Sequence, residues 1–296
     1  MLYGAHVSSS GGISNAIGRA QELGCDAVQV FTQSPRMWRP TTHAPEEAAR
    51  FRAHRAEASI GAVVCHALYL VNLASPDPEI HDKSVAAMQS TMATASAIGA
   101  DAVVFHLGSH LGAGLETAVE RLTPALRELL ELTTDDLWLC LENCAGAGGT
   151  IGRSVDELAL VVDALEGHER LGVCLDSCHW WASGVDVTDP ATLDAAVSEL
   201  DLRIGLDRLR CLHVNDAASA LGSNLDRHAS VGVGELGAKL GVFLAHPAFQ
   251  ELPAILETPG PEGRGPDAEE IRRLRDLHRR GLQNAKRRAA RAKTAR

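Results

Sequence analysis

Six residues of the types that bind metal ions recur along the sequence at intervals of 34 to 44 positions. They are His66, His106, Glu142, Asp176, His213 and Glu257. Each stands at the end of a short apolar run. A single histidine in such a place is usually an ordinary buried polar residue. Six such groups buried together without a cation would meet severe desolvation and repulsion, so the pattern indicates a metal centre.

Three further residues of these types lie in two short segments. His179 follows Asp176 by three positions, and Asp226 and His228 are separated by one residue. One transition ion takes about four or five ligands, so nine residues, some of them bridging, predict a cluster of two or three ions. Imidazole with carboxylate suits Zn²⁺ or Mn²⁺. Ions held side by side can activate a water molecule and stabilise a leaving oxygen, which is the chemistry of phosphodiester hydrolysis.

Eight apolar runs must position these residues, and polar turns and helical patterns separate them. The runs are residues 2–6, 27–31, 62–66, 102–106, 138–142, 172–176, 209–213 and 254–257. Their hydrophobicity is continuous rather than alternating, which is typical of parallel strands buried on both faces. Eight strand and helix units in one chain predict a single (β/α)8 TIM barrel. The strand ends, with the metal cluster, would then meet at its C-terminal mouth.

Helix-start signals support this alternation at three places between the runs. Pro45 with Glu46 and Glu47 opens one helical pattern, residues 154–157 resemble a capping box, and Asp189 with Pro190 opens another. No Pro- and Gly-rich linker divides the chain. We therefore expect one catalytic barrel domain over residues 1–271.

Charge is distributed unevenly along the 296 residues. The formal net charge is −10, yet residues 272–296 hold eleven Lys and Arg and a single acid, Asp276. This basic tail begins with a helical pattern and then loses its apolar face, so we expect it to be partly helical or disordered. Two interpretations stay open for it, a solvated solubilising tail and non-specific attraction to nucleic acid. The acidic balance argues against a protein that simply coats a polyanion.

Composition excludes several other classes of protein. Apolar residues make up 45% of the chain, and no run approaches the about 20 apolar residues of a membrane helix. The first residues lack the basic start and apolar stretch of a signal peptide, so we expect a cytoplasmic protein. The seven cysteines are odd in number with no Cys-x-x-Cys spacing, which favours buried free thiols.

Three long motifs carry a resemblance to a known family. They are residues 66–74 (HALYLVNLA), residues 172–179 (GVCLDSCH), and residues 212–216 (LHVND) followed by residues 222–228 (GSNLDRH). With them the chain resembles the endonuclease IV family of apurinic/apyrimidinic (AP) endonucleases over essentially residues 1–260. The resemblance implies a TIM barrel with a trinuclear zinc centre, which agrees with the barrel and the cluster inferred from the residues.

The resemblance also implies how the ligands divide among three Zn²⁺ ions. His66 and His106 would hold one ion, and Glu142, the expected catalytic residue, would bridge it to a second. Asp176, His213 and Glu257 would complete that second site. His179, Asp226 and His228 would hold the third ion. The family hydrolyses the phosphodiester 5′ to an abasic site, leaving a 3′-hydroxyl and a 5′-deoxyribose phosphate, and it trims blocked 3′ ends.

The implied partner is double-stranded DNA that contains abasic or 3′-blocked lesions. By resemblance, Arg36, Tyr69 and Leu70 would enter the duplex and fill the gap left by an extruded nucleotide. One departure from the family pattern bears on DNA contact, because Ala218 stands where a Lys is usual. We expect the protein to be a monomer and not to associate with a membrane.

Two rival functions were weighed against the nuclease. A sugar isomerase or epimerase of the same barrel superfamily also binds a divalent metal at strand ends, but it lacks the third set formed by His179, Asp226 and His228. A zinc-dependent DNA-binding protein without activity would be expected to have lost a ligand, and all nine positions are filled. The nuclease is therefore favoured.

Overall fold

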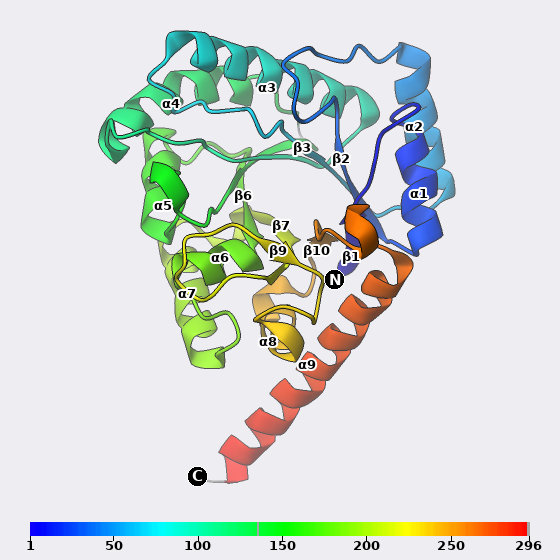
Figure 1. The fold of residues 1–296 in the computed structure, drawn as a ribbon, viewed down its shortest axis with the longest axis vertical. Helices are drawn as coiled ribbons and strands as arrows, with labels where there is room; N and C mark the ends of the chain where they lie inside the picture. The colour runs from blue at the N-terminus through cyan, green and yellow to red at the C-terminus, as the bar shows by residue number, and fades with distance from the viewer. Residues whose placement is uncertain (135, 295–296) are drawn as a thin grey trace.

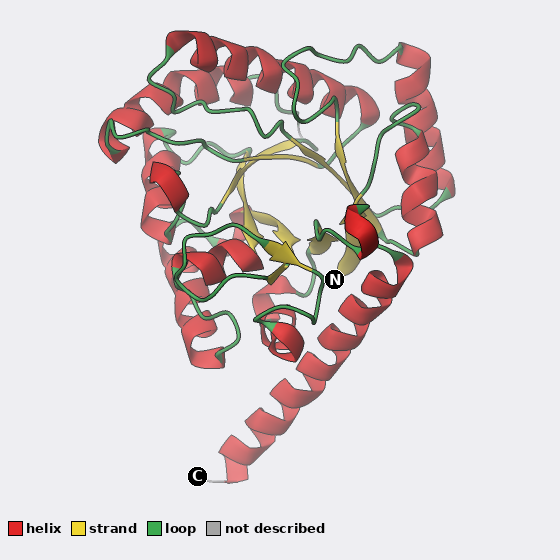
Figure 2. Cartoon of the chain, in the orientation of Figure 1, coloured by secondary structure: helices red, strands yellow, loops and turns green. Residues whose placement is uncertain are grey.

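Eight parallel strands form a closed barrel in the computed structural model, which describes residues 1–134 and 136–294 (Figures 1 and 2). Neighbouring strands pair in chain order, and β10 pairs with both β7 and β1 to close the ring. The strands are β1 (Leu2–His6), β2 (Ala27–Phe31), β3 (Ala62–His66), β4 (Ala102–Phe105), β5 (Trp138–Glu142), β6 (Leu171–Asp176), β7 (Leu209–His213) and β10 (Pro253–Leu256). The predicted TIM barrel is confirmed, and each strand end lies within one residue of its predicted position.

Helices surround the barrel and cover the outer faces of its strands (Figure 2). They are α1 (Asn15–Leu23), α2 (Pro45–Glu57), α3 (Pro78–Ile98), α4 (Leu115–Leu130), α5 (Val155–Ala164), α6 (Ser177–Ser183), α7 (Pro190–Arg203), α8 (Leu240–Leu244) and α9 (Ala268–Thr294). The predicted starts are confirmed: α2 begins at Pro45, Ser154 Oγ accepts from Glu157 N, and the Asp189 carboxylate accepts from Ala191 N. None of the helices in the described ranges is long and apolar enough to cross a membrane.

Small and branched side chains fill the barrel interior below the strand ends. Val64, Val104, Cys140, Cys174 and Cys211 pack there in one buried cluster. All seven cysteines of the chain are free and buried, as their spacing predicts. Because the interior is a packed core, polar strand-end residues have only the C-terminal mouth in which to gather.

A small hairpin over the mouth has no counterpart among the predicted strands. Its strands, β8 (Asp216–Ala217) and β9 (His228–Ala229), pair in antiparallel fashion. The Asp216 carboxylate is fully buried and accepts hydrogen bonds from four backbone N–H groups just after β9, at distances of 2.9 to 3.1 Å. Those donors belong to Gly232, Gly234, Leu236 and Gly237. This one side chain fixes the path of the chain that leads away from His228.

The division expected after residue 271 falls inside α9. Ile271, Leu274 and Leu277 are buried against the barrel, so the first turns of the basic tail belong to the packed domain. The helix then continues to Thr294.

Replacing Asp216 with Asn should test the role of this carboxylate in holding the hairpin. The amide would set an N–H group against backbone donors, so we expect the free energy of unfolding to fall by about 3 kcal/mol. Denaturant unfolding measures the change. The control Asp163→Asn, at an exposed position of α5, should stay within about 0.5 kcal/mol of the parent protein. Equal stability of the two variants would contradict the role assigned to Asp216.

Candidate metal centre

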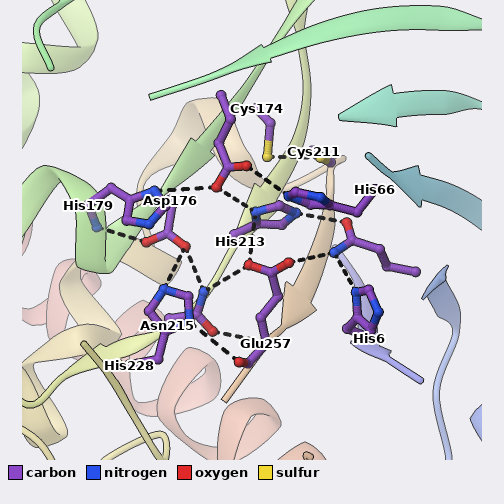
Figure 3. Close-up of polar contacts among 12 residues, drawn as sticks. His6, His66, Cys174, Asp176, His179, Cys211, His213, Asn215, His228 and Glu257 are labelled. Atoms are coloured by element: carbon purple, nitrogen blue, oxygen red, sulfur yellow. Dashed lines mark hydrogen bonds and ion pairs between the residues drawn. The ribbon is translucent and has the colours of Figure 1, made fainter. Parts of the chain in front are cut away.

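The nine residues expected to bind metal gather at the C-terminal mouth of the barrel (Figure 3 labels six of them: His66, Asp176, His179, His213, His228 and Glu257). His66, Glu142, Asp176 and His213 end strands β3, β5, β6 and β7, and His106 and Glu257 immediately follow β4 and β10. Three come from other elements. His179 lies in the first turn of α6, Asp226 precedes β9, and His228 begins it.

Glu142 lies at the centre of this group with no exposed surface. Its Oε1 is 3.0 Å from His213 Nδ1 and 3.3 Å from His179 Nδ1. Its Oε2 is 3.2 Å from His66 Nε2 and 3.6 Å from His106 Nε2. Burial opposes the charge on this carboxyl, but the surrounding imidazoles, His106 and His213 foremost, hold its pKa well below the ordinary value. Glu142 is therefore an anion that contacts both sides of the cluster.

Asp176 and Glu257 lie close to His213. His213 Nδ1 lies 3.1 Å from Glu257 Oε2. Asn215 Nδ2 donates to Asp176 Oδ2 at 2.6 Å, and Asn215 Oδ1 accepts from the backbone N–H of Glu257 at 2.9 Å. Burial would raise the pKa of Glu257, but His213 lowers it to about 2. The Glu257 carboxylate is thus ionised, and the Asn215 amide links it to Asp176.

Asp226 bridges two imidazoles at the edge of the cluster. Its Oδ2 is 3.3 Å from His179 Nε2, and its Oδ1 is 3.2 Å from His228 Nε2. The same His228 nitrogen lies 3.7 Å from Asp176 Oδ2. This nitrogen is buried and forms no hydrogen bond with the described part of the chain. A donor atom aimed at two carboxylates without a hydrogen bond is what a cation site requires.

Three histidines are fixed in orientation by one ring nitrogen that lies close to a carbonyl or amide oxygen. His66 Nδ1 is 2.7 Å from the carbonyl oxygen of the next residue, His179 Nδ1 is 2.9 Å from the Asn143 carbonyl, and His213 Nε2 is 2.8 Å from Gln29 Oε1. Donation to these oxygens leaves the other ring nitrogen facing a carboxylate. A neutral imidazole would then point a lone pair at an anion, so either a proton or a metal cation must lie between them.

Eight of the nine residues fall into three groups, in each of which all donor atoms lie within 4.8 Å of one another, and the first two groups share Glu142 and His213. The groups are His66 with Glu142 and His213, then Glu142 with Asp176, His213 and Glu257, then His179 with Asp226 and His228. The mixed nitrogen and oxygen donors fit divalent transition ions. His106 lies outside these groups, at 3.6 Å from Glu142 Oε2. Cys174 and Cys211 also lie within such a distance of His213, from below.

Three residues around the cluster carry no signal in the sequence spacing, and a fourth, His6, ends the apolar run of residues 2–6. Gln29 Nε2 donates to Glu257 Oε1 at 2.6 Å and lies 3.0 Å from His6 Nδ1. Asn143 accepts from Asp176 N, and Asn215 joins Asp176 to Glu257. The one available clue is that Gln29 is a lone polar residue inside an apolar strand.

The residues expected to contact DNA lie beside the mouth. Tyr69 is 60% exposed, and its ring packs edge-on against Phe31 at 5.1 Å between centroids. Its backbone N–H donates to Pro35 O at 3.2 Å, which brings the loop of Arg36 alongside. Arg36 is exposed and Leu70 half-buried. Tyr69 and Leu70 line a pocket of about 380 Å³ whose wall includes His106, His179 and Asp226.

The protonation of the cluster predicts opposite pH dependence with and without metal. Burial lowers the pKa of His228, but Asp226 and Asp176 outweigh it and raise the pKa to about 9 from 6.5. Carboxylates likewise hold the pKa values of His179 and His213 well above normal despite burial. A raised folded-state pKa stabilises the fold below pH 6.5 and loses that effect as the pH approaches 9. Metal ions require the unprotonated rings, so their binding strengthens over the same interval.

In chelator, the midpoint temperature of thermal unfolding should therefore decrease as the pH is raised from 6.5 to 9. With added Zn²⁺ the midpoint temperature should not decrease over this interval. Differential scanning fluorimetry measures both series. Asp226→Asn, which removes the carboxylate facing two imidazoles, should reduce the fall in chelator. His246→Gln, a histidine outside the cluster, should preserve it. Identical pH profiles with and without metal would contradict the assignment of these histidines.

Comparison with known proteins agrees with this geometry. Residues 17–280 match the family model described as a xylose isomerase-like TIM barrel. A curated relative named probable endonuclease 4, from Methanoculleus marisnigri, is 43% identical over 94% of this chain and 99% of its own length. The crystal structure of endonuclease IV from Thermus thermophilus superimposes with a TM-score of 0.83 at 36% identity, covering 95% of this chain and 100% of that one. A D-tagatose 3-epimerase-like protein shares the fold at 17% identity, with a TM-score of 0.71 and coverage of 98% and 100%. The chain therefore belongs to the endonuclease IV family of xylose isomerase-like TIM barrels.

Proposed function

We propose that this protein is a zinc-dependent AP endonuclease of DNA repair. It hydrolyses the phosphodiester 5′ to an abasic site and leaves a 3′-hydroxyl and a 5′-deoxyribose phosphate. The observation that carries the proposal is the group of His179, Asp226 and His228 beside the Glu142 centre. Two adjoining cation sites suit a reaction in which one oxygen attacks phosphorus while another leaves.

Nine side chains would hold three Zn²⁺ ions in this proposal. Bound there, the ions would supply Lewis acidity that activates water and neutralises charge on the phosphate oxygens. The protein's own contribution is orientation. Glu142 contacts imidazoles of two groups at once, and Asn143, Asn215 and Gln29 fix the ligand side chains by hydrogen bonds. Such supporting contacts keep the site rigid before substrate arrives.

The rim of the mouth supports selection of an abasic nucleotide. The pocket of about 380 Å³ leads to His106, His179 and Asp226, so a sugar-phosphate must leave the base stack to reach them. An abasic nucleotide has lost its pairing and stacking and is extruded at the lowest cost. The exposed Tyr69 ring and the exposed Arg36 lie on neighbouring loops beside the mouth, which supports their proposed entry into the vacated space. In this proposal the three residues Arg36, Tyr69 and Leu70 stabilise the opened duplex.

The sugar isomerase or epimerase alternative is not favoured. The epimerase-like neighbour is 17% identical, which shows a shared fold and nothing about activity. An isomerase requires one metal site around Glu142, Asp176, His213 and Glu257. It gives no reason for Asp226 to lie at 3.2 to 3.3 Å from two further imidazoles. The second set of ligands therefore favours phosphodiester hydrolysis.

A duplex oligonucleotide with one abasic analogue tests the proposed reaction. The purified protein should cut the strand 5′ to the lesion, and a strong chelator should abolish the cut. Added Zn²⁺ should restore it, while the same duplex without the lesion stays intact. Electrophoresis against marker fragments identifies the 3′-hydroxyl end. Absence of any chelator-sensitive incision would refute the proposed function, and turnover of a ketose under the same conditions would support the isomerase.

Glu142→Gln tests the bridging role proposed for this carboxylate. The amide keeps the shape but loses the charge that faces four imidazoles, so we expect the incision rate to fall by about 100-fold or more. Circular dichroism should still report a folded barrel. The control Glu199→Gln, at an exposed position of α7, should cut at the parent rate. Near-normal incision by a folded Glu142→Gln protein would exclude the bridging role.

A further inference from the structure

Helix α9 crosses the barrel from its mouth to the opposite face. Near its start, the Glu270 carboxylate accepts from Thr258 Oγ1 at 2.9 Å, just after the end of β10. Eight residues later, His278 Nδ1 lies 2.7 Å from Tyr3 Oη, and His278 Nε2 lies 2.8 Å from Gln250 Oε1. Tyr3 stands near the start of β1, at the end of the barrel away from the metal ligands. His278 therefore lies near the end of the barrel opposite the metal centre, and the helix continues beyond it.

A glycine allows α9 to approach α8 closely. Gly281 is buried against α8, where a Cβ atom would overlap the carbonyl group of Gly241. Past this crossing Leu282 and Ala285 are half-buried, and every residue of the range 286–291 is exposed. Figure 1 shows the final turns projecting away from the barrel with no other element beside them. The match to the family model ends at residue 280, so this projecting part lies outside the shared barrel.

The projecting part is strongly basic, while the rest of the chain is acidic. Residues 277–296 contain eight Lys and Arg and no Asp or Glu. Since the whole chain has a net charge of −10, the other 276 residues together carry −18. Within residues 277–291, six basic residues are exposed. They are Arg279, Arg280, Lys286, Arg287, Arg288 and Arg291.

Helical spacing places most of these charges on one side of α9. Arg280, Arg287 and Arg291 follow one another at seven and four residues, and Arg279 and Lys286 are seven apart beside them. At 1.5 Å per residue, this stripe is about 18 Å long. Duplex DNA presents one phosphate charge per about 1.7 Å of its axis, so a stripe of this length can contact several phosphates. The exposed apolar residues between the charges are alanines, which offer little to a protein partner.

We propose that residues 279–291 form a basic arm that binds the phosphate backbone of undamaged duplex DNA. Because the arm starts near the barrel end opposite the metal centre and projects away from the barrel, one molecule would hold two duplex segments, one at the mouth and one on the arm. The choice of DNA as the polyanion rests on the proposed function. The arm would supply the sequence-independent affinity that the acidic barrel lacks.

The test compares two variants of equal net charge by fluorescence anisotropy with an undamaged labelled duplex. The arm variant carries Gln at Lys286, Arg287, Arg288 and Arg291. The control carries Gln at Arg50, Lys83, Arg127 and Arg203, which are exposed on the outer helices of the barrel. Binding is measured in chelator over a range of salt concentrations. The parent and the control should bind alike, while the arm variant should bind at least about tenfold more weakly at low salt. Its slope of log K against log salt should fall by about three to four.

An unchanged salt slope in the arm variant would overturn the proposal. Circular dichroism should show that both variants keep the helix content of the parent. Since the duplex is intact and metal is absent, the result is independent of incision. A negative result in the abasic-site assay would not contradict DNA binding by the arm. A negative result for the arm variant would not contradict the proposed nuclease activity.

A capture experiment tests the two-segment geometry. Protein bound to an immobilised abasic-analogue duplex should retain a second, labelled, undamaged duplex, and the arm variant should not. Sedimentation without DNA tests an alternative partner of the arm, which is the acidic barrel of a second protein molecule. A parent that self-associates through the arm, with no arm-dependent DNA binding, would replace the proposal with a dimer contact.

Discussion

The Glu142 carboxylate has no solvent contact and lies among four imidazoles, and this constraint organises the mouth of the barrel. A buried anion is costly unless positive charge compensates it. Here compensation comes from protons on the histidines or from metal ions between the donor atoms. The hydrogen bonds around the cluster follow from the same need. Gln29, Asn143 and Asn215 hold the outward faces of the ligands, so the inward faces converge on one volume.

The closed barrel explains why sequence spacing was informative. Continuous apolar runs identify parallel strands, and closure brings the last residue of each to one rim, so residues up to 191 positions apart, such as His66 and Glu257, become neighbours. The hairpin of β8 and β9 escaped prediction because strands of two residues have no periodicity. The roles of Gln29 and Asn215 escaped because a lone buried amide has no spacing signal, and only the structure reveals its partners.

In helix α9, the helical conformation continues beyond the residues that pack against the barrel. Its apolar face ends after Leu277 and Leu282, which led us to expect a partly helical or disordered tail. The structure continues the helix to Thr294. Ala, Lys and Arg dominate these last turns and are strong helix formers, which accounts for continued helix without a packed face. In the proposed account, the basic arm supplies affinity for DNA and the mouth of the acidic barrel supplies selectivity.

We propose that nine side chains hold three ions around Glu142. Anomalous diffraction at the zinc absorption edge, from crystals of protein purified without chelator, tests it most directly. The account predicts three peaks at the mouth, each within about 2.0 to 2.2 Å of its nearest nitrogen and oxygen donors. The third should lie among His179, Asp226 and His228. A single peak near Glu142, or a peak on the buried pair Cys174 and Cys211 instead, would contradict it.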